Sequence, residues 1–85
     1  MKITIKKEIE ETHELELPAY RKNSIYFYKI INEKQAVQIC VAEDNESIAM
    51  SYTTSALKLA PIESNEEEFD AKLNETVELL KKKIG

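Results

Sequence analysis

The side chains of greatest chemical reactivity are few in this chain and stand apart from one another. His13 is the only histidine and Cys40 the only cysteine among 85 residues. A histidine can transfer protons near neutral pH, but the neighbours Glu11 and Glu14 are typical of an ordinary strand surface. A reactive cysteine needs a nearby base or positive charge, whereas Cys40 follows alternating apolar residues. We therefore predict no catalytic residue.

Two further runs of polar residues lack the companions that a binding site needs. The hydroxyl run Thr53-Thr54-Ser55 lacks the glycines and the lysine that a phosphate-binding loop would have. It is more typical of a strand end. The acids at 66–68 fit the start of a helix, and those at 43–46 are too few for a calcium loop and include no glycine. We expect no metal and no cofactor.

Aromatic and basic residues gather in residues 18–42, which hold four Lys and Arg against one acid although the whole chain has a net charge of −4. Aromatic rings beside cations can stack bases and neutralise phosphates of single-stranded nucleic acid. Tyrosine is equally suited to protein interfaces. The candidate interaction surface comprises Tyr20, Arg21, Lys22, Tyr26, Tyr28, Lys29 and Ile30.

Length and composition predict a single domain spanning residues 1–85. Hydrophobic residues make up 42% and charged residues 33% of the chain. A domain this small has little room for an enclosed cavity. No apolar run approaches the ~20 residues of a membrane span, and the first residues lack the apolar core of a signal peptide. With one cysteine and no intramolecular disulfide, we expect a cytoplasmic protein that does not enter a membrane.

The last third of the chain has the spacing of an amphipathic helix over about residues 64–84. Its start is marked by one of two capping pairs, Ser64 with Glu67 or Asn65 with Glu68. Acids in the first turn and lysines in the last turn suit the helix dipole. Apolar residues three and four apart form one stripe, namely Phe69, Leu73, Val77, Leu80 and Ile84.

Three upstream segments have the composition and alternation of β-strands. Residues 25–31 are apolar on both faces, which predicts a central strand. Residues 35–42 and 47–53 alternate apolar and polar side chains. The short polar segments 32–34 and 43–46 predict turns, and hence an antiparallel meander.

The remaining segments are less clearly patterned. Residues 2–17 predict either one long bent strand or two strands joined near residues 10–12, and the lack of Gly, Pro or Asn there favours the long strand. Residues 19–24 are predicted to be a loop, and residues 56–60 a short strand or an irregular connection. The predicted fold class is α+β: an antiparallel sheet of about four strands packed on one face by a single C-terminal helix.

The face of the sheet opposite the helix carries the main functional expectation. If the helix covers Phe27, then Tyr26, Tyr28 and Ile30 project from the other face. We expect a small protein-interaction or assembly module without catalytic activity. It would bind a foreign protein or a second copy of itself through the face that the helix leaves uncovered.

Two alternatives use the charges instead. The first is a single-stranded nucleic-acid binder using the Tyr, Lys and Arg of residues 20–29, which the net negative charge disfavours. The second is an acidic inhibitor or nucleic-acid mimic using residues 63–70 and 43–46. Binding by such a mimic would weaken steeply with salt.

Overall fold

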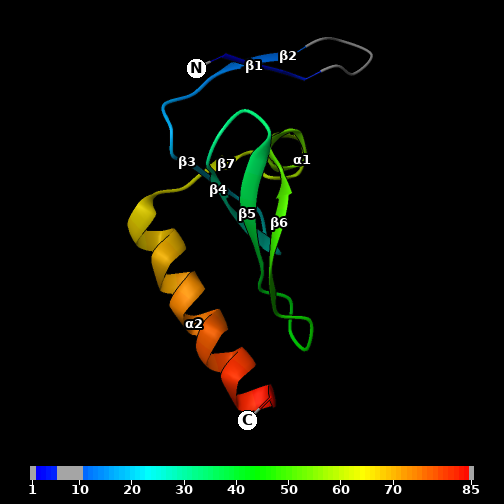
Figure 1. The fold of residues 1–85 in the computed structure, drawn as a ribbon, viewed down its shortest axis with the longest axis vertical. Coiled ribbons are helices and arrows are strands. Elements are labelled where there is room, and N and C mark those ends of the chain that lie inside the picture. Colours follow the sequence, from blue (N-terminus) through cyan, green and yellow to red (C-terminus); the bar gives the residue numbers. More distant parts are fainter. Residues whose placement is uncertain (1, 6–10, 85) are drawn as a thin grey trace.

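The computed structural model describes residues 2–5 and 11–84 and confirms the α+β class (Figure 1). Helix α2 lies beside one face of an antiparallel sheet, and the two-stranded sheet of β1 and β2 lies at the other end of the molecule from the last turn of α2. The elements in chain order are β1 (Lys2–Ile5), β2 (Glu11–Glu14), β3 (Ala19–Lys22), β4 (Tyr26–Ile30), β5 (Gln35–Cys40), β6 (Ser47–Tyr52), α1 (Thr53–Leu59), β7 (Ile62–Glu63) and α2 (Glu66–Ile84).

The main sheet has five antiparallel strands in the order β6-β5-β4-β3-β7. The predicted meander corresponds to β4, β5 and β6, and both predicted turns are present. The side-chain oxygen of Asn32 accepts the backbone N–H groups of Lys34 and Gln35 at 2.8 Å each. In the next turn the N–H of Asn45 donates to the carbonyl of Ala42 at 3.0 Å. Strand β6 forms one edge of this sheet, and β7 forms the other.

Helix α2 covers the sheet face that carries Phe27, as predicted. Phe69 of the helix is buried with Phe27 and Ile39, and Leu73 packs against them. Thr76 is the next fully buried helix residue, whereas Ile84, predicted to continue the apolar stripe, is exposed. The helix therefore buries its first half by aromatic and aliphatic packing and leaves its end in solvent.

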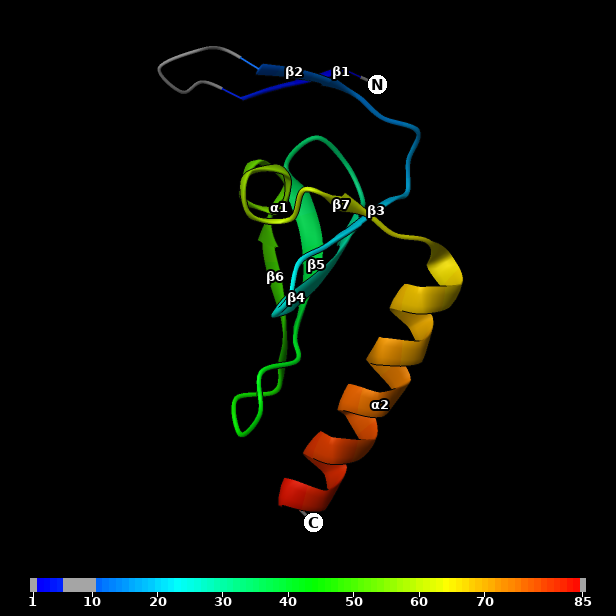
Figure 2. The ribbon, with the colours of Figure 1, turned by 180° about the vertical axis from the view of Figure 1, so that it is seen from behind.

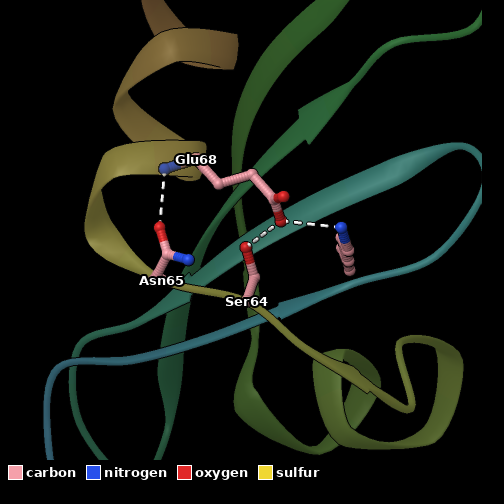
Figure 3. Close-up of polar contacts among 4 residues, drawn as sticks. Ser64, Asn65 and Glu68 are labelled. Atoms are coloured by element: carbon pink, nitrogen blue, oxygen red, sulfur yellow. Dashed lines mark hydrogen bonds and ion pairs between the residues drawn. The ribbon is translucent and has the colours of Figure 1, made fainter.

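The start of α2 is fixed by the second of the two predicted capping pairs (Figure 3). The N–H of Glu68 donates to the side-chain oxygen of Asn65 at 2.8 Å, which satisfies one of the free amides of the first turn. The hydroxyl of Ser64 donates to the Glu68 carboxylate at 2.6 Å, and the Lys22 ammonium lies 2.8 Å from the same carboxylate. This network ties the first turn of α2 to strand β3.

The second face of the main sheet is also covered, so the expectation of an open face was wrong. Tyr28 and Ile30 are 0% exposed. They belong to a second buried cluster together with Leu15, Ala56 and Leu57. Helix α1 and the segment after β2 therefore cover the face that the sequence had assigned to binding.

The physical reason for this correction lies in residues 53–59, which form helix α1 where a strand end and an irregular connection were expected. Seven residues make fewer than two helical turns, so no periodicity could distinguish this helix in the sequence. Its first residue, Thr53, is buried and donates its hydroxyl to the carbonyl of Asn32 at 2.7 Å. That bond holds the start of α1 to the turn between β4 and β5.

Two other segments differ from the predictions. Strands β1 and β2 pair in antiparallel fashion, with Lys2 opposite Glu14, so the preference for one long strand was wrong. The alternative placed the connection near residues 10–12. Residues 11 and 12 belong to β2, and residues 6–10 lie outside the described residues. Residues 19–22 form β3 rather than a loop, because pairing with β4 supplies backbone partners that the local sequence does not reveal.

The packing of Phe69 should dominate the stability of the helix–sheet contact. Phe69→Ala removes a ring buried against Phe27 and Ile39 and should lower the free energy of unfolding by about 3–5 kcal/mol. Ile84→Ala changes an exposed side chain and should alter it by less than about 0.5 kcal/mol. Urea denaturation followed by circular dichroism measures both, and equal losses would contradict this packing.

Candidate functional site

The structure does not bring the seven predicted surface residues together on one surface. Tyr20, Lys22 and Lys29 share the α2 face, as the strand register requires. Arg21, Tyr26, Tyr28 and Ile30 share the α1 face. The segment therefore contributes to two separate clusters, one on each side of the sheet.

The basic residues of this segment are engaged within the chain. The Arg21 guanidinium lies 3.2 Å from the Glu63 carboxylate. The Lys22 ammonium pairs with Glu68, and the Lys29 ammonium lies 6.0 Å from the centre of the Tyr20 ring. These contacts reduce the positive charge that a nucleic-acid phosphate would need.

Tyr28 is likewise committed to the interior. Its hydroxyl donates to the side-chain oxygen of Gln38 at 2.9 Å. Burial raises the pKa of Tyr28, with a further contribution from Tyr26. A fully buried ring with an internal hydrogen-bond partner cannot stack a base or a partner side chain.

The reactive residues considered first also stay apart. His13 lies in β2, and its side chain is outside the part of the chain that the structure describes. Cys40 is a buried free thiol at the end of β5. Within residues 2–5 and 11–84, no group of His, Cys, Asp and Glu is arranged to hold a metal ion.

The feature that sequence reasoning missed is the outer edge of strand β6 (Figure 1). Ile48, Met50 and Tyr52 are 36%, 58% and 72% exposed. They lie opposite Ile39, Val37 and Gln35 of β5, so all three side chains project from the α2 face. We call these three residues the β6 stripe. Depressions beside it are lined by residues of β6, of the turn between β4 and β5 and of the start of β5, namely Asn32, Glu33, Lys34, Gln35, Met50, Ser51 and Tyr52.

The direction of the backbone groups of β6 follows from one hydrogen bond at its end. The N–H of Thr53 donates to the carbonyl of Lys34 at 3.1 Å, in continuation of the register between β5 and β6. Backbone groups alternate in direction along an antiparallel strand. Ser51 and Ala49 therefore face β5, whereas the N–H and C=O groups of the β6 stripe face outward, where no described strand pairs with them.

Strand β6 lacks the features that usually protect a sheet edge from other strands. Such features are short length, charged side chains, proline or a bulge. The strand has six residues, Ser47–Tyr52, with no charge and no proline, and its pairing with β5 is continuous. The opposite edge strand, β7, has only two residues and ends in Glu63. Of the two edges of the five-stranded sheet, the β6 edge is therefore the longer and uncharged surface for another strand.

The last turn of α2 approaches the beginning of β6 and stops short of most of the β6 stripe. The ammonium of Lys83 bonds to the carboxylate of Glu46, directly before the strand. Met50 and Tyr52 lie further along β6, and α2 leaves both exposed. The sequence did contain a signal for this site: an alternating strand whose aligned residues are large and apolar and which has no charge on either face.

The contact between Glu46 and Lys83 predicts a measurable titration. The hydrogen bond from Lys83 lowers the pKa of Glu46 below its ordinary value of 4.5. Because the folded-state pKa is lowered, the stabilisation is present above the unfolded-state pKa and is lost as the pH falls through the folded-state value. NMR titration of the Glu46 carboxyl should show the low pKa, and Lys83→Met should return it toward 4.5. An unchanged Glu46 pKa in that variant would contradict the contact.

Among the described residues, no helix is both long enough and apolar enough to cross a membrane. Comparison of the chain with protein-family models, with curated proteins and with solved structures gave no significant match. Any function must therefore be derived from the arrangement of this chain's own residues.

Proposed function

We propose that this protein is a small protein-interaction module without catalytic activity that binds an extended strand of a partner along the edge of β6. The observation that carries the proposal is a six-residue edge strand with unpaired outward backbone groups and an exposed apolar stripe. Addition of a strand to an open sheet edge is a recurrent mode of protein recognition. The proposal retains the expected class of function and moves the binding surface from the sheet face to the sheet edge.

At this edge the backbone groups would supply affinity, and the side chains would supply specificity. The outward N–H and C=O groups of the β6 stripe would pair with any extended backbone. The side chains of Ile48, Met50 and Tyr52 would select a partner strand that presents apolar residues toward the α2 face. Met50 has a flexible side chain that adapts to varied apolar surfaces.

The proposal also includes the compartment in which the protein acts and the kind of partner that it binds. We propose that the protein acts in the cytoplasm, which its single free cysteine supports because no disulfide is needed within the chain. The partner is either a foreign protein or a second copy. No observation favours the nucleic-acid alternative among the described residues, since Arg21 and Lys22 are paired with acids and Tyr28 is buried.

Photo-cross-linking tests the proposal in the cell. Tyr52→p-benzoylphenylalanine places a photoreactive group at the exposed end of the β6 stripe. On irradiation it should form a covalent adduct with a protein, visible as a discrete band of higher mass. Adding Met50→Lys should reduce that band at least tenfold, because a charge in the centre of an apolar contact costs more than about 1.4 kcal/mol.

The matched control places the same photoreactive group at Leu59, an exposed residue of α1 on the other side of the sheet. That position should give no discrete adduct. Equal adducts at positions 52 and 59, or an adduct at 52 that persists with Met50→Lys, would contradict binding through the β6 edge.

A further inference from the structure

We propose that the strand bound by β6 is the β6 strand of a second copy of this chain, paired antiparallel about a two-fold axis that passes through Met50. The two five-stranded sheets would then form one continuous sheet. This inference rests on the proposed function of the β6 edge and specifies its partner. Three properties of the strand carry it: the direction of its backbone groups, the sequence of its side chains and its lack of charge.

The direction of the backbone groups restricts the register. In an antiparallel pair, two directly opposite residues exchange both hydrogen bonds only if the groups of both face the partner. The outward-facing residues of β6 are Ile48, Met50 and Tyr52, which are spaced symmetrically about Met50. With Met50 opposite Met50 of the partner subunit, Ile48 lies opposite Tyr52 of the partner subunit. Every outward N–H and C=O of the β6 stripe then has a partner.

The side chains are complementary in that same register. Opposite residues of antiparallel strands project from the same face, so the β6 stripes of both copies would meet on the α2 side of the sheet. Each Ile48 would pack beside a Tyr52 of the partner subunit, and a β-branched residue beside an aromatic ring is a favourable cross-strand pair. The two flexible Met50 side chains would fill the centre.

The lack of charge on β6 permits pairing with a copy of the same chain. Recognition of a foreign strand commonly uses complementary charges at the edge, and β6 has none. A charged strand that met itself would place like charges opposite each other, whereas no residue of Ser47–Tyr52 is charged. Glu46 is also paired with Lys83 of its own chain. The strand thus has no local repulsion against itself.

The approach to the edge is open along the β6 stripe. Figures 1 and 2 show β6 at one side of the sheet and the first half of α2 at the other side. Helix α1 packs inward over Tyr28, Ile30 and Ala36 on the other face. The contact area of two six-residue edges is small, so the dimer should dissociate on dilution.

The first experiment measures mass against concentration by sedimentation equilibrium, from about 10 μM to about 1 mM. The wild-type chain should pass from monomer to dimer over this range. Met50→Lys should stay monomeric, and Leu59→Lys, which adds the same charge on the α1 side, should behave as the wild type. Added salt should strengthen the dimer, because each copy has a net charge of −4. Circular dichroism verifies that each variant is folded.

The second experiment tests the register with single cysteines in a Cys40→Ala background and a bis-methanethiosulfonate reagent that spans ~5 Å, the separation of opposite residues. Met50→Cys should cross-link to itself. Ile48→Cys alone and Tyr52→Cys alone should not, since like residues would lie four residues apart, about 14 Å along the strand. A mixture of Ile48→Cys and Tyr52→Cys should give one heterodimeric product.

The inference is overturned if the wild-type chain remains monomeric throughout the range, if Met50→Lys still dimerises, if salt dissociates the dimer, or if Ile48→Cys cross-links to itself. Failure of the inference is distinguishable from failure of the proposed function. Suppose that the wild-type chain is monomeric, but residue 52 still cross-links to a different protein and this adduct depends on Met50. Pairing with a second copy is then contradicted, whereas binding through the β6 edge is retained. A monomeric chain that forms no such adduct would contradict both the inference and the proposed function.

Discussion

Strand β4 imposes the constraint on which the rest of the structure depends, because its residues are apolar on both faces of the sheet. Phe27 faces one side, and Tyr28 and Ile30 face the other, and all three are buried. Water must be excluded from both faces at once, so the chain needs two covering layers. Helix α2 supplies one with Phe69, and α1 together with Leu15 supplies the other. Residues of β4 and β5 belong to the buried clusters under these covers, whereas no residue of β6 does.

Much of this fold could be predicted from the sequence, because its strongest signals are local. The stripe and caps of α2, the alternation of the strands and the polar turns each depend on neighbouring residues. The short helix α1 and strand β3 could not be predicted in the same way. Seven helical residues carry too little periodicity, and the strand state of Ala19–Lys22 depends on pairing with β4 and β7. The hairpin of β1 and β2 was predicted only as the less favoured alternative, because no Gly, Pro or Asn in this region marks a turn.

The face predicted to bind a partner is not open, for a related reason. Sequence parity placed Tyr26, Tyr28 and Ile30 together on one face, and the strand register agrees. Whether that face is open depends on α1, which the sequence did not reveal. Once the face is covered, exposed apolar surface remains at the β6 stripe, and the backbone groups behind it are unpaired among the described residues. An edge strand with no charge would normally invite unwanted association, and the proposed partner strand would account for this composition.

Amide hydrogen exchange measured residue by residue with NMR tests this account most directly, because it reads the direction of each β6 backbone group. The amides of Ala49 and Ser51 face β5 and should be protected at every protein concentration. Those of Ile48, Met50 and Tyr52 should exchange rapidly in dilute solution and become protected as the concentration rises and the edges pair. Protection of all five amides in dilute solution would show that the edge is already closed within one chain. Unchanged rapid exchange of Ile48, Met50 and Tyr52 at the highest concentration would contradict pairing of β6 with a second copy.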